Sequence, residues 1–210
     1  MLDSFQRAVL DAFFRRENRF FLTGGGALTG FYLAHRETKD LDLFTTEDCL
    51  EEGVRALADL ALELGASLEA LRTEPEFRRY LVRRGQAGVV VDLVRDRAPQ
   101  LFPKKRAVGQ LRVDLPEEIL ANKLSALLSR AEIRDLVDVR ALEKAGYPIE
   151  PLLAPAMRKD GGLTPGQLSW VLSQIEIGDD AELPGGVSPP EMREYLEDLQ
   201  ARLGRLALPE

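Results

Sequence analysis

Three consecutive glycines, Gly24–Gly26, separate a short apolar run from a segment with helical spacing of its apolar residues. Residues 20–23 predict a buried strand, and residues 27–34 predict a helix that follows the glycines. Backbone N–H groups at such a helix start can bind an anion, and glycine lets a phosphate approach closely. The turn is not a Walker loop, because no Gly-Lys-Ser/Thr follows, and many glycine turns bind nothing.

Hydrophobic periodicity divides the rest of the chain into two parts. Before residue 114 we expect helices at 4–17 and 47–64 and strands at 41–44, 67–73, 77–84, 87–94 and 111–115, with a basic loop over 95–107. Pro116 then opens a helical series at 116–130, 133–145, 149–158, 165–175 and 189–207. The pattern predicts an α/β domain over residues 1–113 and a helical domain over residues 114–210.

Two aspartates alternate with leucines in the predicted strand Asp40-Leu41-Asp42-Leu43-Phe44. Because side chains alternate along a strand, Asp40 and Asp42 share one face, about 7 Å apart along the backbone. A divalent cation suits two such carboxylates, and Mg²⁺ prefers carboxylate and phosphate oxygens. Asp92, inside an apolar run, is the candidate third ligand of a two-metal phosphoryl-transfer site. The alternative is that Asp40 caps a turn and Asp92 pairs with an arginine.

A second group of candidate residues lies on the predicted helices after Pro116. Lys123 falls within the apolar stripe of its helix, so it must either extend to solvent or meet a negative partner. That partner is a triphosphate or, alternatively, a buried aspartate. Asp135 and Asp138 share a helix face, where one can accept a proton from an attacking hydroxyl or hold Lys123 or Arg130. An i,i+4 pair between Arg134 and Asp138 is the alternative for Asp138.

Composition restricts the classes of function. The net charge of −7 argues against a general nucleic-acid coat, but residues 72–112 carry eleven basic residues against four acidic ones. That segment is either a surface that attracts a polyanion or a solvated strand face. A single cysteine, Cys49, excludes an internal disulfide and favours a reducing cytoplasm. No membrane span and no signal peptide are expected.

Four motifs together resemble the AbiEii/AbiGii nucleotidyltransferase toxin family, within the polymerase-beta-like superfamily. They are LTGGGAL at residues 22–28, HRETKDLDLF at 35–44, ANKLSAL at 121–127 and RDLVD at 134–138. The resemblance implies an α+β fold, in which a polymerase-beta-like nucleotidyltransferase domain, a mixed sheet flanked by helices, precedes an all-helical domain. It implies metal ligation by Asp40, Asp42 and, by strand context, Asp92; nucleotide contact by Gly24, Gly25, Gly26, Thr38, Lys123 and Arg130; and catalytic or supporting roles for Lys123 and Asp135.

Two positions depart from the family pattern. Gly26 stands where serine or threonine is usual, and Thr38 stands where serine is usual. Thr23 and Thr29 are the residues that can supply the hydroxyl missing at Gly26.

The leading hypothesis is a Mg²⁺-dependent nucleotidyltransferase that binds a nucleoside triphosphate between its two domains. Family relatives include toxins that add nucleotides to the acceptor end of tRNA and act beside an antitoxin, so the resemblance implies these partners. The alternative hypotheses are a catalytically silent nucleotide-binding protein on the same fold and an RNA-binding module that uses the basic segment.

Overall fold

The computed structural model describes residues 1–208, which form two compact units. Unit 1 comprises residues 1–97 and 103–115, and unit 2 comprises residues 98–102 and the chain from Pro116 onward. The short segment 98–102 belongs to unit 2 because the backbone N–H of Phe102 donates to the buried Glu118 carboxylate at 2.7 Å. Sequence periodicity does not anticipate this excursion, which depends on a hydrogen bond between distant residues.

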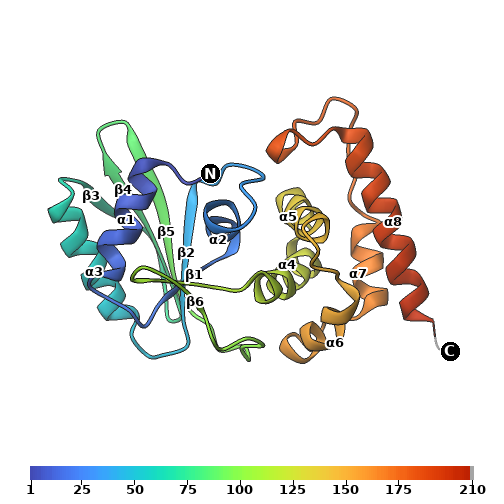
Figure 1. The fold of residues 1–210 in the computed structure, drawn as a ribbon, viewed down its shortest axis with the longest axis horizontal. Helices are drawn as coiled ribbons and strands as arrows, with labels where there is room; N and C mark the ends of the chain where they lie inside the picture. Colours follow the sequence, from blue (N-terminus) through green and yellow to red (C-terminus); the bar gives the residue numbers. More distant parts are fainter. Residues whose placement is uncertain (209–210) are drawn as a thin grey trace. The chain divides into compact units, whose positions relative to one another are not determined.

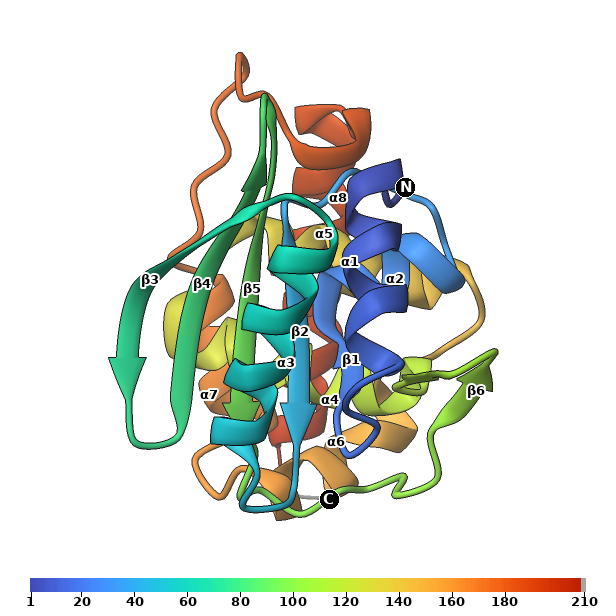
Figure 2. The same cartoon turned by 90° about the vertical axis from the view of Figure 1, so that its left-hand side faces the viewer.

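Unit 1 is built on a seven-stranded mixed sheet with the order β3-β4-β5-β2-β1-β7-β6 (Figure 2). The β2–β5 and β1–β7 pairs are parallel, and the other neighbouring pairs are antiparallel. The strands are β1 (Phe21–Thr23), β2 (Asp40–Thr45), β3 (Ser67–Glu74), β4 (Phe77–Arg84), β5 (Ala87–Arg95), β6 (Arg106–Val108) and β7 (Leu111–Val113). The mixed sheet with flanking helices confirms the expected fold class.

Three helices complete unit 1: α1 (Ser4–Phe14), α2 (Gly24–Phe31) and α3 (Leu50–Glu63). Helices α1 and α3 lie side by side across one face of the sheet (Figures 1 and 2). Their apolar stripes meet an aromatic cluster in which the rings of Phe13 and Phe20 pack edge to face at 5.4 Å. Gly53 lets α3 approach closely, since a Cβ there would lie 2.7 Å from Phe20 and 3.1 Å from Leu93. This face of the sheet is therefore the core of unit 1.

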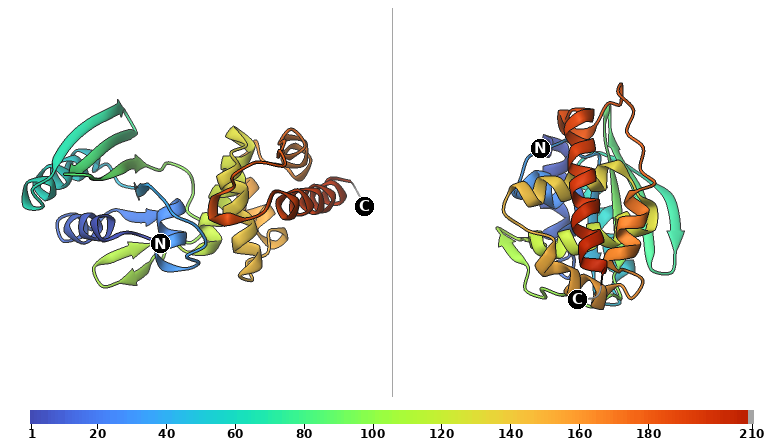
Figure 3. Two further views of the ribbon diagram at one scale, coloured as in Figure 1. Left: turned by 90° about the horizontal axis from the view of Figure 1, so that it is seen from above. Right: turned by 90° about the vertical axis from the view of Figure 1, so that its right-hand side faces the viewer.

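Unit 2 is helical and contains α4 (Pro116–Arg130), α5 (Ile133–Lys144), α6 (Glu150–Lys159), α7 (Pro165–Leu172), the short 3₁₀ helix η1 (Pro184–Gly186) and α8 (Pro189–Ala207). Helix α4 packs against α5, α6 and α7, and α8 lies along α7 (Figure 3). Ser188 and Glu191 form a capping box that starts α8. Fully buried leucines of α4 and α5, including Leu120, Leu124 and Leu136, form the core of this unit.

Two elements differ from the expectation from sequence. Helix α2 begins at Gly24, so it includes the three glycines that the sequence suggested as a turn before it. Strand β6 begins inside residues 95–107, the expected loop, and ends at Val108, because its backbone pairs with β7. None of the helices in residues 1–208 combines the length and apolar character needed to cross a bilayer.

Candidate active site

Strand β2 places Asp40 and Asp42 on the face of the sheet opposite α1 and α3. Its residues alternate between half-buried and buried, and Leu41 and Leu43 are fully buried. Leu43 is the register partner of Leu93, which contacts α3, so the leucines point into the helix-covered core. The two carboxylates must then project from the other face, as the sequence predicted.

The glycine segment lies directly against Asp42 and against the loop residues Arg36 and Thr38. Gly24 has a φ of +61°, and a Cβ built on it would lie 2.2 Å from Oδ2 of Asp42. A Cβ on Gly25 would lie 2.6 Å from Nη2 of Arg36 and 3.4 Å from Oγ1 of Thr38. Gly24 and Gly25 therefore leave space that the side chains of Asp42 and Arg36 occupy.

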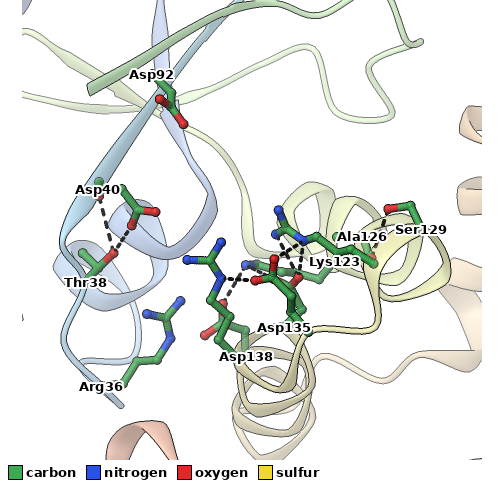
Figure 4. Close-up of polar contacts among 12 residues, drawn as sticks. Arg36, Thr38, Asp40, Asp92, Lys123, Ala126, Ser129, Asp135 and Asp138 are labelled. Carbon is green, nitrogen blue, oxygen red and sulfur yellow. Dashed lines mark hydrogen bonds and ion pairs between the residues drawn. The ribbon is translucent and has the colours of Figure 1, made fainter. Parts of the chain in front are cut away.

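Thr38 and Asp40 form a linked pair at the start of β2 (Figure 4). The Thr38 hydroxyl donates to Oδ1 of Asp40 at 2.6 Å. The carbonyl of Thr38 accepts a 2.7 Å hydrogen bond from Nε2 of Gln6, a buried residue of α1. These contacts orient one oxygen of the Asp40 carboxylate and anchor the loop that carries it to the core.

Asp92 is beside Asp42 in the sheet, but its carboxylate is held by an arginine. The two aspartates are register partners across β2 and β5. Nε and Nη2 of Arg79 donate to the two Asp92 oxygens at 2.8 Å and 2.7 Å. Within residues 1–208 no three carboxylate, thiol or imidazole groups are arranged to hold a metal ion. The expected convergence of Asp40, Asp42 and Asp92 is therefore not formed, because Asp92 pairs with Arg79.

Of the two hydroxyls suggested as substitutes for one at Gly26, that of Thr23 is directed to another residue. Thr23 donates to Oδ2 of the fully buried Asp114 at 2.8 Å, and Lys105 donates to Oδ1 of the same carboxylate at 2.7 Å. Thr29 is buried, and its hydroxyl has no hydrogen-bond partner among the described residues. A Cβ on Gly26 would lie 3.4–3.5 Å from Leu22, Leu41 and the backbone of β2. A side chain at position 26 would thus begin against the sheet.

In unit 2, Lys123 of α4 is clamped by two aspartates of α5 (Figure 4). Its ammonium lies 2.6 Å from Oδ1 of Asp135 and 2.7 Å from Oδ2 of Asp138, and both carboxylates are fully buried. Arg130 donates from Nε to Oδ2 of Asp135 at 2.8 Å. Arg134 pairs with Glu132 at 2.5 Å. The alternative of a buried ion pair for Lys123 is therefore the arrangement observed.

Electrostatics keep this cluster charged. Burial lowers the pKa of Lys123, but the charges of Asp138 and Asp135 overcome that effect and leave it above the usual value. Burial likewise raises the pKa of Asp135, and the interactions with Lys123 and Arg130 bring it below the usual value. An ammonium has three N–H donors, and two are directed at these carboxylates.

The donor set on β2 fits a hard divalent cation. Mg²⁺ is commonly bound by one or two carboxylates together with substrate phosphates. Asp40 and Asp42 supply two carboxylates on one half-buried face, and Gly24 leaves space beside the second.

Two residues of this site were not identified from the sequence as functional. Arg36 could have been identified from its position four residues before Asp40. Arg79 can be assigned to the site only when the register of β4 on β5 is known, because that register pairs it with Asp92.

Solved structures with the same fold include nucleotidyltransferases. JHP933 from Helicobacter pylori is 20% identical with a TM-score of 0.60, over 95% of this chain and 88% of that chain. MenT4, a nucleotidyltransferase toxin from Mycobacterium tuberculosis, is 17% identical with a TM-score of 0.61, over 96% of this chain and 82% of that chain. At these identities the likeness shows the fold alone. No curated protein matches the sequence significantly.

The sequence itself assigns the family. The sequence profile described as nucleotidyl transferase AbiEii toxin, type IV toxin–antitoxin system, matches residues 8–206. The chain therefore belongs to the AbiEii nucleotidyltransferase toxin family and is a nucleotidyltransferase.

Proposed function

We propose that the protein transfers a nucleoside monophosphate from a nucleoside triphosphate to an acceptor hydroxyl. In this reaction the acceptor oxygen forms a bond to the α-phosphorus, the bond to the bridging oxygen breaks, and pyrophosphate leaves as the hydroxyl loses its proton. The observation that carries the proposal is the pair of carboxylates, Asp40 and Asp42, beside the glycine start of α2.

Different residues of unit 1 would bind the metal ion and the triphosphate. Asp40 and Asp42 would hold Mg²⁺, which supplies charge neutralisation for the phosphates when bound. The backbone at Gly24 and Gly25 and the guanidinium of Arg36 would contact the triphosphate, since helix N-termini and arginine both favour phosphate oxygens. Thr38 orients Asp40. Such catalysis depends mainly on positioning and electrostatic stabilisation.

For Lys123 and Asp135 of unit 2 we propose the roles that the family resemblance implies. Lys123 would contact a nucleotide phosphate through the N–H that its two aspartates do not use. Asp135, held between Lys123 and Arg130, would fix that ammonium in place as a supporting residue.

We further propose the partners that the family description suggests. A type IV toxin–antitoxin system implies an antitoxin encoded with this protein, and a tRNA is the acceptor that we propose for the transferred nucleotide.

The test is incubation of the purified chain with each α-labelled triphosphate, Mg²⁺, and total RNA or protein. We expect label to enter the RNA, and we expect Asp42→Asn to reduce this transfer by about a hundredfold or more. Asp59→Asn, at an exposed aspartate of α3, is the matched control and should retain full activity.

Full transfer by Asp42→Asn in a folded state would reject the proposal. Triphosphate binding in a calorimeter with no transfer to any acceptor would instead favour the silent nucleotide-binding alternative. The bidentate Arg79–Asp92 pair is the observation that keeps this second candidate open.

A further inference from the structure

Charged side chains form a row across four neighbouring strands of unit 1. Asp42 on β2 pairs in register with Asp92 on β5, Asp92 with Arg79 on β4, and Arg79 with Arg72 on β3. We call these four residues the charged row. Register partners in a sheet project to the same face, so two acids are followed directly by two arginines on one surface.

The contact in the middle of the charged row, between Asp92 and Arg79, is a bidentate ion pair. Asp92 is 4% exposed and receives two parallel N–H donors from Arg79. Bidentate arginine–carboxylate pairs are stronger and more specific than single contacts. A carboxylate so deeply buried needs such a partner, because an unpaired buried charge is costly.

Arg79 also experiences the acids of the proposed metal site. Its hydrogen bonds to Asp92 raise the pKa of the guanidinium, burial opposes this, and the charges of Asp92, Asp40 and Asp42 add to the rise. Arg79 therefore contributes one positive charge beside three carboxylates, of which a single divalent cation would balance two.

We propose that Arg79 is a resident counter-cation that withholds Asp92 from metal coordination, so that the site binds a divalent cation through Asp40 and Asp42 alone. Arg79 is a positioning residue, because it acts on the metal site through Asp92 and does not itself contact the cation. The inference rests on the proposed function insofar as it needs a cation at Asp40 and Asp42. It differs from the three-ligand arrangement expected from the sequence, and it names the residue responsible.

The neighbouring Arg78 provides a comparison that separates the effect of Arg79 on Asp92 from the effect of charge alone. Arg78 is on the same strand but points to the opposite face, where it pairs with Glu51 of α3 at 2.9 Å. Both arginines carry the same charge and both pair with an acid. Only Arg79 adjoins Asp92, so the two positions separate a local effect on the metal site from a general effect of net charge.

The experiment is titration of the full chain with Mn²⁺, followed by calorimetry and by the electron paramagnetic resonance signal of free Mn²⁺. The variants are Arg79→Gln, Arg78→Gln, Asp42→Asn and the double variant Arg79→Gln/Asp92→Asn. We expect Arg79→Gln to bind Mn²⁺ about tenfold more tightly, since an added anionic ligand raises affinity. We expect Arg78→Gln and the double variant to bind like the wild-type chain, and Asp42→Asn to lose binding.

Three results would overturn the inference, and they differ in what else they reject. Equal affinities for Arg79→Gln and Arg78→Gln would reject the role of Arg79 while leaving metal binding by Asp40 and Asp42 intact. Loss of binding by the double variant would instead show that the cation needs Asp92 as a ligand. Absence of Mn²⁺ binding by the wild-type chain would reject this inference together with the proposed metal site. If Arg79→Gln leaves Asp92 unpaired and does not fold, the double variant, which removes that charge, still tests whether Asp40 and Asp42 bind the cation without Asp92.

Discussion

At the scale of single residues, the space that Gly24 leaves is as important as its backbone conformation. Its φ of +61° lies in the left-handed region, which disfavours any residue with a Cβ. A Cβ there would also lie 2.2 Å from the Asp42 carboxylate, which cannot stay in place. The two effects can be separated because Gly65 has the same φ with no atom within 4 Å of a built Cβ.

We predict that Gly24→Ala and Gly65→Ala each destabilise the chain by about 1–2 kcal/mol, since both place alanine in the left-handed region. Only Gly24→Ala should also lose Mn²⁺ binding, because its Cβ displaces Asp42. Urea unfolding and Mn²⁺ titration of both variants are the measurements. Wild-type Mn²⁺ affinity in Gly24→Ala would show that the Asp42 carboxylate is not needed in its observed position.

The sequence predicts those site residues whose placement follows from one strand. Asp40 and Asp42 share a face because of a period of two, which is local information. The partner of Asp92 depends on how β4 pairs with β5, and a shift of one residue would put Arg78 on that face instead. The amino-acid sequence suggests an arginine as one alternative partner of Asp92, but it does not identify which arginine.

At the scale of elements, α4 and α5 are joined by charges as well as by leucines. Lys123 and Arg130 come from α4, and Asp135 and Asp138 come from α5, so the pairing spans both helices. Asp135 receives both cations and is fully buried, and removing one partner of a buried ion pair leaves the other charge uncompensated. The cluster is therefore a determinant of how these helices pack, whatever its contact with nucleotide.

We predict that Asp135→Asn destabilises the chain by roughly 3–5 kcal/mol at neutral pH. The folded pKa of Asp135 is lowered, so its stabilisation is complete above the unfolded value of about 3.9 and is lost as pH falls through the folded pKa. The difference from wild type in the free energy of unfolding should thus be constant near neutrality and decrease as the pH falls below about 3.9. Denaturant midpoints between about pH 7 and pH 3 measure it.

Glu132→Gln is the control for this prediction. Glu132 pairs with Arg134 at the half-exposed rim of the cluster, where ion pairs contribute about 1 kcal/mol or less. A pH-independent loss in Asp135→Asn would mean that packing of the side chain, and not its charge, stabilises the helix pair.

Element types were more predictable than element ends. Helices α4, α5 and α8 begin at the expected residues because proline, spacing and capping signals are local. Strand β6 was not expected, since it depends on pairing with β7, and the inclusion of the glycines in α2 was not expected either, since glycine is a poor helix former.

At the scale of the whole molecule, the basic segment of residues 72–112 carries less unbalanced charge than its composition indicates. Arg78 pairs with Glu51 of α3, and Arg95 pairs with Asp48 just before that helix. Lys105 pairs with the buried Asp114, and Arg79 with Asp92. Folding thus brings acids from outside the segment, Glu51, Asp48 and Asp114, to three of these cations, and Arg79 pairs with an acid within it, which weakens the case for a continuous cationic surface.

We therefore predict weak association with total tRNA, with a dissociation constant of about 10⁻⁴–10⁻⁶ M at physiological salt, as is typical of non-specific binding. Arg72, whose side chain is 61% exposed and pairs with Glu74, is one of the exposed basic residues of this segment. Arg72→Gln should lower the slope of log affinity against log salt by about one, and Asp42→Asn should leave that slope unchanged. Fluorescence anisotropy at two salt concentrations measures both. Nanomolar binding with a steep salt dependence that survives Asp42→Asn, without nucleotide transfer by the wild-type chain, would favour the RNA-binding alternative over the enzyme.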